Sequence, residues 1–115
     1  MTTINVLSSN AIKAAYTEIV PQFERASGHK VMTTWAGTND ILKRMQANEI
    51  YDLMIMGRPT LNDLIKAGKV VAGSQGDLVT SGIGVAVRAG APTPDISSGE
   101  AVKRAVLAAK SVGYS

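Results

Sequence analysis

The chain contains no cysteine and one histidine, His29, in 115 residues. The missing cysteines exclude disulfides, thiolate metal sites and cysteine nucleophiles, and a lone histidine argues against a histidine-bound zinc ion. A nucleophilic serine would need a histidine base, which the predicted turns lack nearby. Paired acids, phosphate loops and dinucleotide fingerprints are absent too. We therefore expect no cofactor, no metal and no enzymatic activity.

Long apolar runs and clustered positive charge are also missing. No stretch approaches the ~20 apolar residues of a membrane span, and Met1-Thr2-Thr3 lacks the charged start and apolar core of a signal peptide. Lys and Arg exceed Asp and Glu by 12 to 9, but the basic residues are scattered without interleaved aromatics, so no nucleic-acid partner is expected. The location is cytoplasmic unless a signal peptide has been removed.

The residues that are present favour one compact α/β domain, because 45% are hydrophobic and 18% charged, and 115 residues are too few for two good cores. Residues 4–7 form an apolar run, residues 11–27 repeat apolar positions at helical spacing up to Gly28, and residues 29–35 are extended. Strand, helix and strand in about 30 residues predict a parallel pair with a right-handed crossover.

The same pattern continues along the chain. A helix is expected over residues 40–48, a continuous apolar strand over 51–56 and a helix over 60–67. Residues 78–89 alternate with a period of two, which predicts a long strand passing from one sheet to another. A last helix is expected from residue 98 to about residue 110.

Small polar residues follow the first two strands, and an arginine follows the third. Because carboxyl ends of parallel strands meet at one edge, these turns predict a crevice for a small anion, held by unpaired helix amides and neutral hydroxyls. Helix capping alone is the open alternative for the serine, threonine and asparagine residues. The candidate ligand residues are Ser8, Ser9, Asn10, Gly37, Thr38, Asn39 and Arg58.

The order of these segments resembles the type II periplasmic substrate-binding proteins, and among them the molybdate-binding-protein-like members of the family 1 extracellular solute-binding proteins. The resemblance is carried by Ile4-Asn5-Val6-Leu7 with Ser8-Ser9-Asn10, Phe23 to Val31, Asp52 to Met56, Ile65 to Val71 and Ser111-Val112-Gly113-Tyr114-Ser115. It covers the whole chain as the first half of such a protein. Ala11 stands where molybdate binders place a serine, which leaves another anion open.

The resemblance implies a three-layer αβα lobe with a mostly parallel sheet and a long crossing strand. Residues 1–80 would form the first lobe, residues 81–97 the crossing strand and hinge-side connection, and residues 98–115 the start of a truncated second lobe. Such proteins hold a small anionic ligand between two lobes and deliver it to an ABC permease. That function implies a periplasmic location after removal of a signal peptide.

Two other hypotheses remain open at this stage. The effector-binding domains of LysR-like regulators share this fold and are cytoplasmic, and a truncated fragment could bind nothing because half of its cleft is missing. A lobe without its returning strands would leave sheet edges open, and open edges seek partners. We therefore expect that a second copy could supply the missing strands, giving a homodimer by strand exchange.

Overall fold

The computed structural model describes residues 1–114, which divide into two compact units, Met1–Ser81 and Gly82–Ser115. The first unit holds the sheet and three of the helices, and the second holds helix α4 (Gly99–Ala108). Ser98 begins α4 as expected, since its hydroxyl accepts a hydrogen bond from the Ala101 amide at 3.1 Å. Ser115, the last of the terminal residues that carry part of the resemblance, lies outside the described residues.

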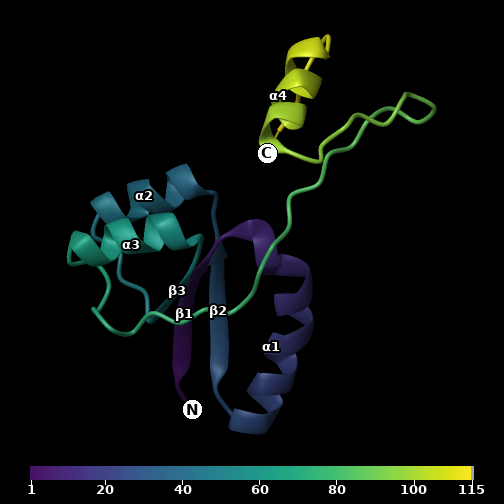
Figure 1. Ribbon diagram of the computed structural model, residues 1–115. Coiled ribbons are helices and arrows are strands. Elements are labelled where there is room, and N and C mark those ends of the chain that lie inside the picture. Colours follow the sequence, from purple (N-terminus) through teal and green to yellow (C-terminus); the bar gives the residue numbers. More distant parts are fainter. Residues whose placement is uncertain (115) are drawn as a thin grey trace. The chain divides into compact units, whose positions relative to one another are not determined.

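Three parallel strands form the sheet, in the order β2-β1-β3 (Figure 1). They are β1 (Thr3–Ser8), β2 (Lys30–Trp35) and β3 (Leu53–Ile55). The central strand β1 pairs with both neighbours, and its last three residues are buried. The parallel pairing expected from the strand–helix–strand spacing is confirmed.

Helices cover both faces of this sheet. Leu7 packs against Ile41 of α2 (Thr38–Gln46) and Leu64 of α3 (Arg58–Lys66). On β2, Thr33 pairs with Val6, the neighbour of Leu7, and is hydrogen-bonded to a tyrosine of α1 (Lys13–Ser27). Successive residues of a strand face opposite sides, so α1 lies on one face and α2 with α3 on the other, as Figure 1 shows. The expected αβα layering is confirmed.

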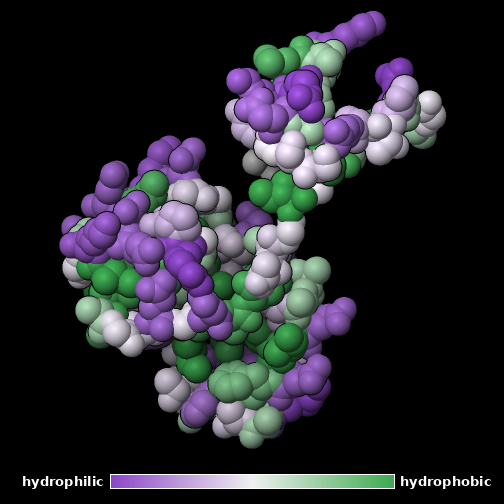
Figure 2. Space-filling model, in the orientation of Figure 1, coloured by the Kyte–Doolittle hydropathy of each residue, from purple (hydrophilic) through white to green (hydrophobic). Residues whose placement is uncertain are grey.

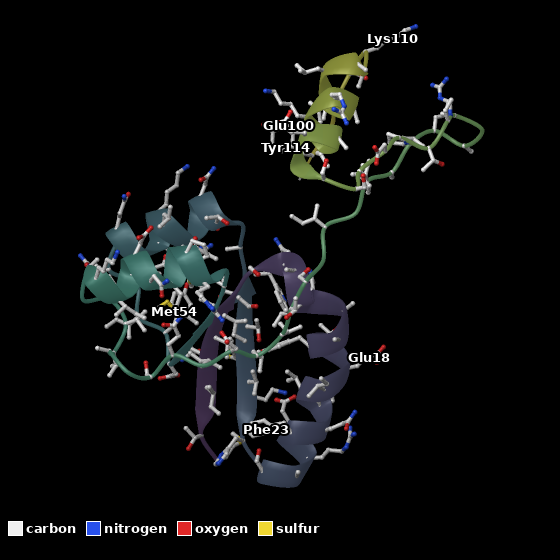
Figure 3. The ribbon with its side chains drawn as sticks, viewed as in Figure 1. Glu18, Phe23, Met54, Glu100, Lys110 and Tyr114 are labelled. Atoms are coloured by element: carbon white, nitrogen blue, oxygen red, sulfur yellow. The ribbon has the colours of Figure 1, made fainter. Side chains whose placement is uncertain are left out.

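The core is concentrated on the face covered by α2 and α3. Its buried members are Leu7, Ala36, Ile41, Met45 and Leu64. Met54 packs against this cluster from β3 and lies beside α3 in Figure 3, whereas Glu18 projects from α1 away from the sheet.

The other face is less covered than the sequence predicts. The helical repeat over residues 11–27 predicts that Ile19 and Phe23 pack into the core, yet they remain 59% and 43% exposed, and α1 has no buried residue. The described residues provide no further strand beneath that side of α1, so part of its apolar stripe stays uncovered.

The helices begin earlier or later than expected. A 3-10 turn, η1 (Asn10–Ile12), precedes α1, so Asn10 does not cap it. Helix α2 starts at Thr38 with Gly37 at the N-cap, and α3 starts at Arg58. None of these three starts has a side-chain cap, so the capping interpretation of the polar turns fails locally.

The long crossing strand expected over residues 78–89 is not formed. Between α3 and α4 the described residues contain no helix or strand, and Leu78, Ile83 and Val85 are 70%, 100% and 55% exposed. An alternating apolar pattern becomes a strand only when a neighbouring strand accepts its hydrogen bonds. No strand of residues 1–114 pairs with this segment.

No helix among residues 1–114 has the length and apolar character that a bilayer span requires.

A polar cluster fixes the turn between α2 and β3. Arg44 lies 3.1 Å from both Asp40 and Glu49, and the Tyr51 hydroxyl donates to the Glu49 carboxylate at 2.5 Å. The hydrogen bond from Tyr51, followed by contacts from Arg44, lowers the pKa of Glu49 below its ordinary value of 4.5. These contacts act on an exposed carboxylate, so solvent weakens them.

This cluster predicts a defined pH dependence of stability. A carboxylate whose folded pKa is lowered stabilises the fold above its unfolded pKa, and this contribution is lost as the pH falls through the folded pKa. The Tyr51→Phe variant should therefore be less stable than the wild type near pH 7 and should lose that difference as the pH falls below 4.5 and the Glu49 carboxylate becomes protonated. Urea midpoints across this range measure it, and a difference that does not change with pH would contradict the assignment.

Candidate ligand-binding site

The carboxyl ends of the three strands meet at one edge of the sheet. Ser8 of β1 pairs with Trp35 of β2 and with Ile55 of β3, the last residue of each strand. The turns after the strands therefore leave from adjacent positions. We call residues 9–12, 36–38 and 56–58 together the carboxyl edge.

Backbone hydrogen bonds tie these turns to one another. The Ala36 amide donates to the Ser8 carbonyl at 3.0 Å, and the Ser9 amide donates to the Ile55 carbonyl at 2.8 Å. Each turn leads into a helix, whose first amides have no intrahelical partner and carry a partial positive charge. Since η1 and α1 leave on one face and α2 and α3 on the other, the turn after β1 diverges from both neighbours. Ligands bind at such divergence points in open α/β sheets.

The predicted residues of the first turn have different environments. Ser8 is fully buried, and its hydroxyl donates to the Ser9 carbonyl at 3.0 Å, so this side chain supports the turn from within. Ser9 is partly buried and Asn10 is exposed. In the second turn, Gly37, Thr38 and Asn39 are all exposed at the start of α2.

A groove of about 1230 Å³ runs along β3 in the first unit. Ser9 reaches it from the turn after β1, and Gly57 and Arg58 reach it from the turn after β3. Its outer wall comes from the segment that follows α3 and includes Val71, Leu78 and Val79, all more than half exposed. In Figure 2 apolar side chains are exposed on the first unit beside the hydrophilic surface of α2 and α3.

The structure thus brings together two of the predicted turns in one groove and leaves the third beside it. Ser9 and Arg58 line the groove, whereas Gly37 and Thr38 belong to the carboxyl edge without lining the groove, and Asn39 follows them in α2. All seven candidate residues lie in the carboxyl edge or directly beside it in the sequence, and their contact with a ligand stays a prediction.

Arg58 is the first residue of α3 and the arginine that lines the groove. Its Nη2 lies 2.5 Å from Oδ1 of Asp77, and the two side chains are 63% and 76% exposed. The groove also contains Lys69, which donates to Asn48 at 2.6 Å, and Asp52, which accepts from the Asn5 amide at 2.8 Å. Arg58 is therefore the basic group at the carboxyl edge that can hold a carboxylate bidentately.

An aromatic contact joins α1 to the end of β2. The Tyr16 ring of α1 meets the Trp35 ring edge-on, with centroids 5.1 Å apart, and Lys13 Nζ lies 5.5 Å from the Trp35 centroid. Such contacts stabilise beyond the area they bury. Trp35 is partly buried and does not line the groove.

The sequence did not reveal Asp77, the partner of Arg58. The two residues are far apart in the chain and belong to no shared motif, and Asp77 lies in a segment without helix or strand. Only the path of the chain after α3 brings it back to the start of that helix.

Comparison of the sequence with known proteins places the chain in a family. The sequence model of a family described as bacterial extracellular solute-binding protein matches residues 4–115. An aconitate isomerase from a Pseudomonas species is 38% identical over 120 residues, which cover all of this chain and 46% of the relative. The chain therefore spans about half the length of the curated relative it matches.

This relative overturns one expectation. The absence of catalytic motifs led to the prediction that the protein is not an enzyme, and that prediction is contradicted because the relative is an isomerase. The exclusion considered nucleophile–base pairs, paired acids and nucleotide motifs within this chain alone. It could not consider groups that a longer relative contributes outside the matched half. The comparison also supports the wider solute-binding family and not its molybdate-binding members.

Proposed function

Because the chain belongs to the bacterial extracellular solute-binding proteins, we propose that it is the first lobe of a protein that binds a small polycarboxylate of the aconitate class and isomerises it. The observation that carries this proposal is the presence of Ser9 and Arg58 in one groove at the carboxyl edge. The similarity to an aconitate isomerase supports the ligand class and the reaction.

The chemistry of the carboxyl edge suits carboxylates. Aconitate carries three of them, and each needs hydrogen-bond donors or a cation. Arg58 supplies a planar fork that matches one carboxylate, and the amides at the starts of η1, α2 and α3 supply donors with a partial positive charge. Ser9 and Thr38 add hydroxyl donors. A tetrahedral oxyanion would use the same donors, the guanidinium fork included, so the similarity to an aconitate isomerase, and not the fork, favours a carboxylate ligand.

The second candidate is transport, and the family match favours it. In this role the protein is periplasmic, captures the same anion and presents it to an ABC permease. Binding for transport and isomerisation both begin with capture at the carboxyl edge, so one protein can do either. The family match also favours a binding protein over the LysR-like regulator.

The domain limits and the oligomer belong to the same proposal. We assign residues 1–80 to the first lobe, residues 81–97 to the crossing segment and residues 98–115 to the start of the second lobe. The exposed side chains of residues 78–88 and the unpaired outer edge of β3 support strand exchange between two copies. The exchange would give both elements the partner that the described residues do not provide.

Ligand-dependent melting tests the proposed function. Trans-aconitate and cis-aconitate should raise the melting temperature of the protein, and the stabilisation should grow with the logarithm of ligand excess over Kd. Molybdate and sulfate are the controls for a tetrahedral oxyanion. Proton NMR of cis-aconitate incubated with the protein then measures conversion to the trans isomer. Stabilisation by molybdate but not by aconitate would refute the proposal.

A further inference from the structure

The Arg58–Asp77 ion pair already shows how a carboxylate binds at this edge. Oδ1 of Asp77 lies 2.5 Å from Nη2 of Arg58, and both residues line the groove that Ser9 also lines. A ligand carboxylate that used the same guanidinium would have to take the place of the Asp77 carboxylate. The chain therefore contains its own competitor for the cation that the proposed function assigns to the ligand.

Displacing Asp77 requires little rearrangement. The two side chains are 63% and 76% exposed, and exposed ion pairs contribute little to stability. Residues 76–81 form no helix or strand, and Leu78 and Val79 are 70% and 60% exposed. Nearby, the Ser74 hydroxyl donates to the Val71 carbonyl, and Gln75 Nε2 donates to Oδ1 of Asn62 in α3 at 3.3 Å. The ion pair is thus the polar side-chain contact that Asp77 itself makes with α3, while Gln75 holds the chain to α3 just before residues 76–81.

We propose that Asp77 is an internal carboxylate that occupies Arg58 in the free protein and is displaced when a polycarboxylate binds at the carboxyl edge. This inference rests on the proposed function. Because Asp77 belongs to the same chain, it competes at a fixed effective concentration. It lowers the affinity of every ligand that needs Arg58, and ligand binding releases residues 76–81 from the start of α3.

The sign of one substitution distinguishes a competitor from a structural partner. Asp77→Asn removes the competing charge, so the protein should bind trans-aconitate about 1.5- to fivefold more tightly than the wild type, the range expected for an exposed pair. A residue that merely held the groove together would weaken binding when replaced. Isothermal titration calorimetry with trans-aconitate at fixed ionic strength measures the change.

Two matched variants complete the experiment. Asp63→Asn removes the same charge from an exposed position of α3 that has no ion pair with Arg58, so it reports the general effect of lost negative charge. In the Arg58→Ala background, Asp77→Asn should give no gain beyond that of Asp63→Asn, because no guanidinium remains to be freed.

Each outcome decides the inference. Unchanged or weaker binding by Asp77→Asn, relative to Asp63→Asn, would overturn it while leaving the proposed ligand in place. A gain that persists without Arg58 would also overturn it, because Asp77 would then repel the ligand directly. If neither the wild type nor Asp77→Asn binds trans-aconitate, the proposed ligand fails, and the inference fails with it.

Discussion

The Arg58→Ala variant is expected to bind trans-aconitate at least about tenfold more weakly than the wild type. A hydrogen bond to a charged group contributes about 1.5–3 kcal/mol, and each 1.4 kcal/mol is a factor of ten in Kd. Arg58 lines the groove and begins α3, so its loss removes the guanidinium and leaves backbone amides, hydroxyls and Lys69, whose ammonium already donates to Asn48. Isothermal titration calorimetry gives the two dissociation constants.

Two control variants separate recognition of the ligand by the Arg58 guanidinium from a general effect of the protein's net charge. Lys66→Ala removes one positive charge from the exposed last turn of the same helix and should leave Kd nearly unchanged. Arg58→Lys keeps the charge but loses the planar fork, so its affinity should lie between those of wild type and Arg58→Ala. Equal losses in Arg58→Ala and Lys66→Ala would show that only net charge matters.

The Leu7→Ala variant is expected to lose about 2–5 kcal/mol of the free energy of unfolding. Leu7 is 0% exposed at the centre of the cluster that joins β1 to α2 and α3. Folded domains are stable by only about 5–15 kcal/mol, so this single cavity removes a large share of the total. Urea denaturation followed by circular dichroism measures the loss.

A second leucine provides the matched control. Leu78 is 70% exposed, and its replacement by alanine should change the free energy of unfolding by no more than about 0.5 kcal/mol. A comparable loss in Leu78→Ala would mean that residues 76–81 pack more tightly than their exposure indicates. A loss below about 1 kcal/mol in Leu7→Ala would contradict the location of the core.

The parallel sheet and its carboxyl edge could be predicted from the sequence because they depend on periodicity. A helical repeat between two extended runs leaves few topologies, and a parallel pair places Ser9 and Thr38 at the same edge whatever the details of packing. The structure confirms that edge through the pairing of Ser8 with Trp35. Local patterns were sufficient for this part of the fold.

Contacts that depend on the path of the chain could not be predicted. Asp77 reaches Arg58 only because the segment after α3 returns along β3. The alternating pattern of residues 78–89 likewise indicates a segment that would form a strand beside another strand. No strand among the described residues pairs with it. A periodic pattern describes a preference, and tertiary partners decide whether it is realised.

Helix starts were misplaced for a local reason. Hydroxyl and amide residues suggested side-chain caps, whereas the N-caps of α2 and α3 are Gly37 and Gly57. Thr38 and Asn39, which were candidates for capping α2, therefore lie inside the first turn of that helix. Arg58, which the sequence places in a turn, is instead the first residue of α3. Its backbone amide and its guanidinium are therefore at the same end of that helix.

The most direct test of the central claim is amide chemical-shift mapping of trans-aconitate binding by proton–nitrogen NMR. The ligand should shift the amides of the carboxyl edge, with the largest changes at Ser9, Thr38 and Arg58, and leave the opposite end of the sheet near His29 unchanged. Shifts that cluster around His29, with none at the carboxyl edge, would contradict a site built at the ends of the parallel strands.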